Sequence, residues 1–187
     1  MANGRAISAV MPAWNEEQGI VETVESLRAA LAGCAEEFEI VLVDDGSTDA
    51  TGRLMDGLAE KYSQVRVIHH SQCEGYGASL RDGFLAAKLR LVLQTDASGR
   101  FDFNEIPLLV ARIDQADIVA GYRTRRRDSW GRRLLSRGFR FLAGLTFGVY
   151  LRDVNCPLKL YRRKVFKQMT MVLICIDADN LPALSTE

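Results

Sequence analysis

Acidic side chains follow the first apolar runs of this 187-residue chain. Glu16 lies shortly after one run, Asp44 and Asp45 end a second, and Asp96 ends another. Carboxylates accept hydrogen bonds from N–H and O–H groups, and they are the ligands that hard divalent cations prefer. Such acids therefore suit a metal-bridged phosphate, or the base and ribose of a nucleotide, better than a bare pyrophosphate.

The elements that would position these acids alternate between strand and helix patterns. Apolar runs predict strands over residues 6–13, 38–45, 65–70, 90–96 and 116–122. Helical spacing and N-terminal signals predict helices over residues 16–31, 46–62, 75–88 and 103–113. This order is typical of an α/β domain, a mostly parallel sheet with helices on both faces. Ligands bind at the carboxyl ends of the strands in such sheets, which is where the acids lie.

The composition limits the function classes. It is 48% hydrophobic and 26% charged, which fits one soluble globular domain with a sizeable core. The 24 basic residues balance the 24 acidic residues, so no overall field would attract nucleic acid. The cysteines form no CxxC pair, and we expect reduced thiols in a cytoplasmic protein, with Cys156 packed in the interior. No apolar run approaches the roughly 18 residues that a membrane span needs.

Two short features could be mistaken for ligand sites. The histidines, His69 and His70, are adjacent at the end of a predicted strand, so they would face opposite sides and make a poor metal pair. We expect both at the surface or at a loop edge. The glycine-rich stretch 75–80 lacks the third glycine of a dinucleotide fingerprint and follows the third predicted strand, so it is a weak match.

Five motifs occur in a familiar order, namely VMPAWNEE, VLVDDGSTDAT, GYGASLRDGF, QTDASGRFDFNEI and RDVNCPLKLYRRKVF. Together they resemble the family 2 inverting glycosyltransferases, which have the Rossmann-like A-type glycosyltransferase fold. Within this family, the chain is most similar to the dolichol-phosphate mannose synthase and polyprenyl-phosphate sugar transferase branch. The resemblance implies a catalytic domain over residues 1–168. It also implies that residues 169–187 are a short C-terminal segment, truncated relative to the family.

The resemblance assigns the donor pocket to the loops after the first two predicted strands. Pro12, Trp14 and Glu16 would line the nucleotide pocket, and Trp14 stands where the family often has tyrosine. Val43 and Asp45 would hold the base and the ribose. The expected donor is therefore a nucleotide-diphosphate sugar.

The predicted metal loop departs from the family pattern. Where the family commonly has Asp-x-Asp-Gly-Gln, this chain has Asp96, Ala97, Ser98, Gly99 and Arg100. The resemblance implies that this loop holds Mg²⁺ or Mn²⁺ against the donor diphosphate. Asp96 would be a catalytic residue and the first metal ligand, and Ser98 would be the second metal ligand. A serine offers only a neutral hydroxyl or holds a metal-bound water. Two interpretations stay open: either Arg100 partly replaces the cation by pairing with the diphosphate, or the site binds metal weakly and works slowly.

A basic amphipathic segment follows, over residues 123–150. Arginines crowd it, Asp128 is its only acid, and Trp130, Leu134 and Phe141 belong to an apolar stripe. This pattern is typical of a helix that lies in a membrane interface, so we expect peripheral contact with the cytoplasmic face of a membrane. A core helix with solvated arginines stays open as an alternative. A nucleic-acid surface is disfavoured because the aromatic residues do not interleave with the basic ones.

The basic segment fits an acceptor that carries a phosphate. The resemblance implies that Arg123 contacts phosphate or sugar and that Asp153 and Lys159 lie near the acceptor. Arg133, in the basic segment, would bind the acceptor phosphate. We therefore expect inverting sugar transfer to a polyprenyl phosphate, in which a phosphate anion attacks without much help from a base. Asp153 would serve as a base only for a hydroxyl acceptor. Two alternatives stay open. One is transfer to a saccharide hydroxyl, and the other is a degenerate, truncated transferase that acts as a nucleotide- or membrane-binding module.

Overall fold

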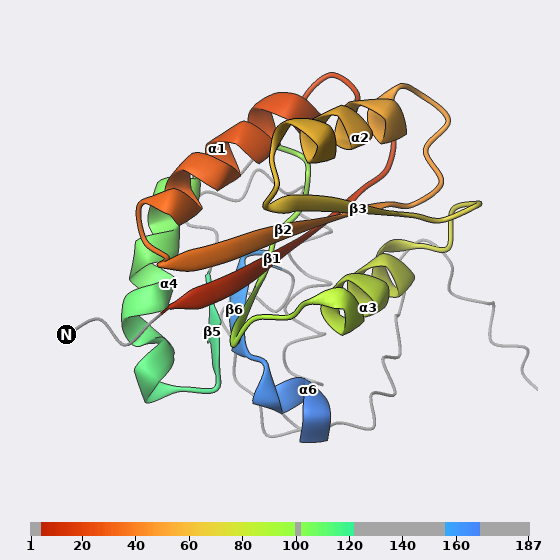
Figure 1. Cartoon of the computed structure of the whole chain (residues 1–187). Coiled ribbons are helices and arrows are strands. Elements are labelled where there is room, and N and C mark those ends of the chain that lie inside the picture. The colour runs from red at the N-terminus through yellow and green to blue at the C-terminus, as the bar shows by residue number, and fades with distance from the viewer. Residues whose placement is uncertain (1–4, 100–101, 122–155, 169–187) are drawn as a thin grey trace, which may run out of the picture.

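The structure is a computed structural model that describes residues 5–99, 102–121 and 156–168. Its centre is a six-stranded sheet in the order β3-β2-β1-β4-β6-β5 (Figure 1). The strands are β1 (Ala6–Ala13), β2 (Glu37–Asp44), β3 (Val65–His69), β4 (Leu91–Gln94), β5 (Ile118–Ala120) and β6 (Lys159–Arg162). The helices are α1 (Ile20–Ala32), α2 (Thr51–Lys61), α3 (Tyr76–Ala86), α4 (Ile106–Arg112) and α6 (Lys164–Gln168). Two 3-10 turns, η1 (Phe103–Glu105) and η2 (Ile113–Gln115), flank α4.

Strand β1 pairs in parallel with β2 on one side and with β4 on the other. In this register Pro12 lies opposite Val43, and Val10 lies opposite Gln94. Strand β3 adds in parallel to β2, whereas β6 runs antiparallel between β4 and β5. The strand order therefore runs away from β1 in both directions, and ligands of open α/β sheets bind at such a switch point.

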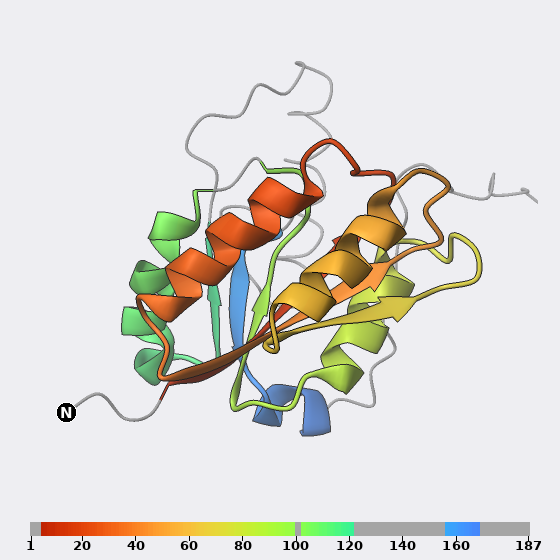
Figure 2. The ribbon, with the colours of Figure 1, turned by 45° about the horizontal axis from the view of Figure 1, so that its top comes forward.

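Helices cover both faces of the sheet, as Figures 1 and 2 show. On the face under α1 and α2, Ile7 and Met11 of β1 join Leu27 of α1 in the larger core. On the other face, Val10 packs with Phe84 of α3. Because both faces are buried, the central strands are continuous apolar runs rather than alternating patterns.

The predicted fold class is confirmed, a single mixed α/β domain with a mostly parallel sheet. The strand expected over residues 6–13 has the same bounds in the structure, but the helix expected from residue 16 begins at Ile20. The delay has a local cause, because Asn15 has a positive φ of 53° and the Glu16 carbonyl accepts the amides of Gly19 and Ile20 in a turn. Among the described residues, no helix has both the length and the apolar content to span a bilayer.

Helix α3 approaches β1 closely at Gly83. A Cβ atom on Gly83 would lie 2.3 Å from Val10 Cγ1 and 3.3 Å from Val43 Cγ2. The first distance is far inside a normal carbon–carbon contact, so a side chain at position 83 would push the helix off the sheet. Gly57 in α2 is a matched control, because a Cβ atom there would meet no atom within 4 Å.

We predict that Gly83→Ala lowers the free energy of unfolding by about 1–3 kcal/mol, because the added methyl group overpacks the core. Gly57→Ala should raise it by about 0.5–1 kcal/mol, since alanine is the better helix former. Urea denaturation of both variants measures these changes. In a double-mutant cycle, Val10→Ala should relieve part of the Gly83→Ala loss. Simple additivity of the two changes would contradict the role of this contact.

Candidate functional site

The carboxyl edge of the sheet brings together the candidate residues from the first two loops. Pro12 and Val43 are buried register partners on β1 and β2. The Asp45 amide donates to the Ala13 carbonyl at 2.9 Å, which fixes the start of the second loop against the end of β1. Trp14 extends from this edge with 55% of its surface exposed.

The loop after β1 is tied to the loop after β2 by hydrogen bonds. The Asn15 amide donates to Ser47 Oγ at 3.0 Å, and Asn15 Oδ1 accepts from the Thr48 amide at 2.9 Å. The Glu16 amide donates to Thr51 Oγ1 at 2.8 Å. Asparagine is one of the few residues other than glycine that adopts a left-handed backbone readily, so Asn15 can turn the chain and bind the partner loop at once.

Two acids complete this connection between the loops. Asp49 accepts from the amides of Glu17 (3.2 Å) and Thr51 (2.9 Å), and the Glu17 carboxylate accepts from the Ala50 amide (2.9 Å). Burial opposes the charged form of Asp49, but the hydrogen bonds from Thr51 and Glu17 outweigh it and lower the pKa of Asp49. The ionised carboxylate therefore holds the two loops together.

The Asp45 side chain is only 6% exposed and binds the loop of residues 72–75. Oδ1 accepts from His70 Nδ1 (2.8 Å) and the Glu74 amide (2.9 Å), while Oδ2 accepts from the Gly75 amide (2.9 Å) and Cys73 Sγ (3.4 Å). Burial opposes ionisation, but these donors outweigh it and lower the pKa of Asp45. The carboxylate thus orders this loop, and its contact with a base or ribose stays a prediction.

The two histidines face different partners, as expected from their adjacency. His69 binds Asp44 (3.0 Å) and Asp56 (2.9 Å), and 43% of its side chain is exposed. His70 is different, because its side chain is only 6% exposed beneath the 72–75 loop. His70 does lie at a loop edge, as expected, but its side chain is not at the surface. Periodicity does not reveal that a neighbouring loop folds over a strand end.

Gln94, the last residue of β4, links two tyrosines beneath the next loop. Its amide nitrogen donates to the Tyr76 hydroxyl (3.2 Å), and its amide oxygen accepts from the Tyr161 hydroxyl (2.7 Å). Tyr76 is 44% exposed as a residue, but burial around its hydroxyl raises the pKa of Tyr76 to about 12, and the nearby charge of Asp96 adds to the rise. Burial also raises the pKa of Tyr161. Both hydroxyls therefore stay protonated at neutral pH and orient the Gln94 amide.

The predicted metal loop begins two residues after Gln94. Asp96 is half-buried, and its Oδ1 accepts from the Ser98 hydroxyl (2.6 Å) and the Ser98 amide (3.2 Å). Among the described residues, none donates to Asp96 Oδ2. Gly99, with φ of 65°, completes the turn. The donor set therefore fits a cation held by one carboxylate, with Ser98 supporting that carboxylate.

The remaining candidates fall into two groups. Ala97 is buried (3% exposed) in the larger core, and Lys159 begins β6 opposite Gln94 at the same carboxyl edge. Cys156 is buried (2% exposed), as expected for a packed thiol. The other predicted residues and segments lie outside the described residues, namely Arg100, Arg123, Arg133, Asp153, the basic segment 123–150 and the C-terminal segment 169–187.

The sequence reasoning missed several residues that build this edge. Asn15 and Thr51 join the loops, and Gln94 with its two tyrosines supports the Asp96 loop. One signal was available, because Gln94 is a polar residue that closes an otherwise apolar run. Tyr161 had no such signal, since its place depends on the antiparallel strand β6, which no periodicity indicated.

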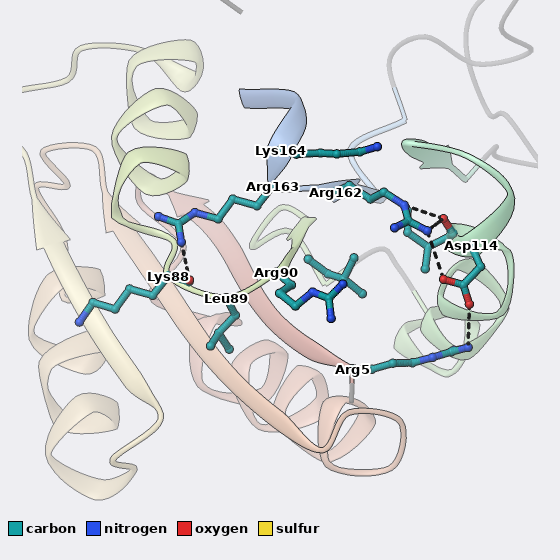
Figure 3. A pocket seen from close by; sticks show the side chains of 10 residues that line it. Arg5, Lys88, Leu89, Arg90, Asp114, Arg162, Arg163 and Lys164 are labelled. Atoms are coloured by element: carbon teal, nitrogen blue, oxygen red, sulfur yellow. Dashed lines mark hydrogen bonds and ion pairs between the residues drawn. The ribbon is translucent and has the colours of Figure 1, made fainter. Parts of the chain in front are cut away.

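A basic cavity of about 590 Å³ lies at the opposite, amino edge of the sheet (Figure 3). Arg5 and Arg162 converge there on Asp114, at 3.9 and 3.2 Å, and Arg163 donates to the Lys88 carbonyl. Its further lining residues include Arg90 and Lys164. Of the sequence-predicted candidates that the structure describes, none lines this cavity.

The sheet order and the loops at its carboxyl edge define an A-type glycosyltransferase fold. Residues 8–170 match the Glycosyl transferase family 2 domain. The chain therefore belongs to glycosyl transferase family 2.

The names of two similar curated proteins each include a polyprenyl phosphate. The chain is 33% identical over 177 residues to the dodecaprenyl-phosphate galacturonate synthase of Rhizobium johnstonii, covering 89% of this chain and 50% of that protein. It is 35% identical over 165 residues to the undecaprenyl-phosphate 4-deoxy-4-formamido-L-arabinose transferase of Edwardsiella ictaluri, covering 87% and 51%. The chain thus spans about half the length of these curated relatives.

Solved structures share the fold at lower identity. Glucosyl-3-phosphoglycerate synthase from Mycobacterium tuberculosis, in complex with Mn²⁺, UDP-glucose and phosphoglyceric acid, has a TM-score of 0.64 and 22% identity over 87% of this chain and 58% of that chain. A mannosyltransferase from Pyrobaculum calidifontis, in complex with GDP-Man and Mn²⁺, has a TM-score of 0.63 and 17% identity over 86% and 45%.

We predict that Asn15→Ala lowers the free energy of unfolding by about 1 kcal/mol more than Asn15→Gly does. Both variants lose the hydrogen bond to the Thr48 amide, but only alanine is strained by the left-handed backbone, which costs about 1–2 kcal/mol. Urea denaturation of the two variants isolates this strain. Equal losses would mean that the backbone conformation of Asn15 contributes nothing to the connection between the loops.

Proposed function

We propose that this chain transfers a sugar, with inversion, from a nucleotide-diphosphate sugar to a polyprenyl phosphate. Membership of glycosyl transferase family 2 and the names of two curated relatives support this proposal. The observation that carries it is the position of Asp96. This residue follows β4 at the switch point beside β1, and none of the described residues donates a hydrogen bond to its Oδ2.

The donor would lie along the carboxyl edge, between the loop after β1 and the Asp96 loop. Trp14, half-exposed, offers a flat apolar face and one N–H group to a base. Pro12 and Glu16 would line the same pocket, with Asp45 on the base and ribose. Val43 is fully buried, so it would shape the wall from behind.

Asp96 would hold Mg²⁺ or Mn²⁺, with Ser98 supporting its carboxylate and Ala97 anchoring the loop in the core. When bound, such a cation stabilises the charge of a departing nucleoside diphosphate. Two solved structures with this fold have Mn²⁺ in their complexes, which supports a divalent cation here. Arg100 would be a second source of positive charge in the same loop.

The proposed acceptor simplifies the chemistry. A phosphate oxygen of the acceptor forms a bond to the anomeric carbon while the bond from that carbon to the diphosphate breaks, and the electron pair leaves with the nucleoside diphosphate. The acceptor is already an anion, so no proton has to be removed. Lys159, Arg123 and Arg133 would bind the acceptor phosphate. Asp153 would orient these cations and would act as a base only for a hydroxyl acceptor.

We further propose peripheral contact with the cytoplasmic face of a membrane through residues 123–150. Basic residues near an anionic surface gain about 1 kcal/mol each, and the apolar stripe of this segment would lie among acyl chains. An acceptor held in a bilayer requires such an approach to the surface.

Asp96→Asn should reduce sugar transfer by about 100-fold or more, because a neutral amide is a poor ligand for the cation that stabilises the leaving group. The measurement is transfer of labelled sugar from UDP-sugars and GDP-sugars to undecaprenyl phosphate in vesicles, with Mg²⁺ or Mn²⁺. Asp114→Asn, at the opposite edge of the sheet, is the matched control and should retain the rate of the unsubstituted chain.

The same assay separates the alternatives. Transfer to a saccharide but not to the lipid would replace the proposed acceptor with a hydroxyl. Calorimetric binding of a nucleotide sugar without any transfer would instead favour a binding module. One specific observation favours the binding module. Ser98 stands where the resemblance leads us to expect a second aspartate, and its hydroxyl donates a hydrogen bond to Asp96.

We predict that Ser98→Asp lowers the Mn²⁺ concentration for half-maximal activity by about tenfold, since a second carboxylate strengthens a hard-cation site. Ser98→Ala is the control and should raise this concentration, because Asp96 loses its hydroxyl donor. Metal titration of the transfer rate measures both changes. An unchanged metal dependence in Ser98→Asp would indicate that Arg100 already supplies the missing charge.

A further inference from the structure

A second group of metal-ligating side chains lies on the β3 side of the sheet, away from the Asp96 loop. His70 follows β3, Glu74 lies in the loop before α3, and Asp82 lies on α3. One ligand atom from each side chain lies within 4.8 Å of the other two. Strands β2 and β1 separate β3 from β4 in the sheet, so this group is distinct from the predicted metal loop.

The contact with Asp45 indicates which ring nitrogen of neutral His70 carries the proton. The carboxylate of Asp45 only accepts hydrogen bonds, so His70 Nδ1, at 2.8 Å, is the nitrogen that carries the proton. In a neutral imidazole the opposite nitrogen, Nε2, then has a lone pair. A carboxylate behind a ligating histidine is the usual outer partner of metal-bound imidazoles, which it orients and makes more basic.

His70 Nε2 is buried and has no hydrogen-bond donor or acceptor among the described residues. It lies 3.3 Å from Asp82 Oδ2, within ion-pair distance but without hydrogen-bond geometry. A lone pair and a carboxylate oxygen repel each other at this distance unless a proton or a metal ion lies between them. Arg81 pairs with Asp82, at 2.7 Å to Oδ1 and 3.2 Å to Oδ2, but this pairing leaves Nε2 unsatisfied.

We propose that His70, Glu74 and Asp82 bind a first-row transition-metal ion of the Zn²⁺ type, with Asp45 as the outer partner of the histidine. Two ligands that share one ion at about 2.1 Å lie roughly 3.0–3.4 Å apart, which matches the separation of Nε2 and Asp82 Oδ2. Glu74 is exposed in its loop and can close the third position.

The donor set selects the class of ion. An imidazole nitrogen suits Zn²⁺ and similar transition ions, whereas Mg²⁺ takes oxygen ligands and gives up its waters reluctantly. The ion would tie the 72–75 loop to α3. Since amides of this loop bind Asp45, the site would stabilise one wall of the carboxyl edge and is independent of whether a sugar is transferred.

The test is a calorimetric titration of the EDTA-treated, dialysed chain with ZnCl₂ in buffer containing excess Mg²⁺, paired with a thermal unfolding curve. We expect one equivalent of Zn²⁺ to bind at this site and to raise the midpoint of unfolding by several degrees. Glu74→Gln and Asp82→Asn should each weaken this binding by about tenfold or more. Glu74→Gln is the decisive variant, because it changes an exposed side chain and spares the fold.

Matched controls locate the ion. Glu60→Gln, an exposed acid on α2, and His69→Gln, at the neighbouring histidine, should leave Zn²⁺ affinity unchanged, and so should Asp96→Asn. Co²⁺ bound in place of Zn²⁺ should give visible d–d bands without a thiolate charge-transfer band, and Cys73→Ser should not alter them.

Three results would overturn the proposal. Undetectable Zn²⁺ binding would mean that a proton, not a metal, lies between His70 and Asp82. Zn²⁺ affinity in the Glu74→Gln and Asp82→Asn variants that is unchanged from that of the unsubstituted chain would place the ion elsewhere in the chain. Displacement of Zn²⁺ by Mg²⁺ at comparable concentration would exclude the assigned class of ion.

Discussion

Strand β1 is paired on both sides, and the loops at the carboxyl edge take their positions from it. Its faces are both buried, so a shift of one residue would exchange the side chains between the two cores, and the register is strongly fixed. The Ala13 carbonyl then holds the Asp45 amide, and the Val10 carbonyl holds the Thr95 amide next to Asp96. The end of β1 therefore fixes the spacing between the loop after β2 and the predicted metal loop after β4.

Charge is divided between the two edges of the sheet. Carboxylates at the carboxyl edge hold loops in place through backbone amides, and those of Asp45 and Asp49 have lowered pKa values, so they stay ionised. The amino edge instead gathers arginines and lysines around Asp114. Phosphates approaching the carboxyl edge would meet negative charge, which makes a bound cation or basic side chains from beyond the described residues a physical requirement of the proposed chemistry.

Much of the fold could be predicted from the sequence because the central strands are buried on both faces and the helices between them have clear periodicity. Strand β6 could not be predicted, because a strand of four residues is too short to show a periodic pattern of apolar side chains. In the site, acids at strand ends were visible as residue types, but Asn15 and His70 were not. Their roles depend on which loop covers them, and that is decided by packing between segments some thirty residues apart.

Strands β5 and β6 are neighbours, although residues 121–158 separate them along the chain. The Gly121 amide donates to the Leu158 carbonyl at 2.9 Å, and Ala120 pairs with Lys159. The pairing of β5 with β6 thus fixes the two ends of the intervening chain, and the entropy of closing a loop grows only with the logarithm of its length. A change of chain length between these two points would therefore cost the sheet little. Under the proposed assignment of residues 123–150 to the membrane and of Arg123 and Arg133 to the acceptor, such a change would alter acceptor preference and leave the donor edge as it is.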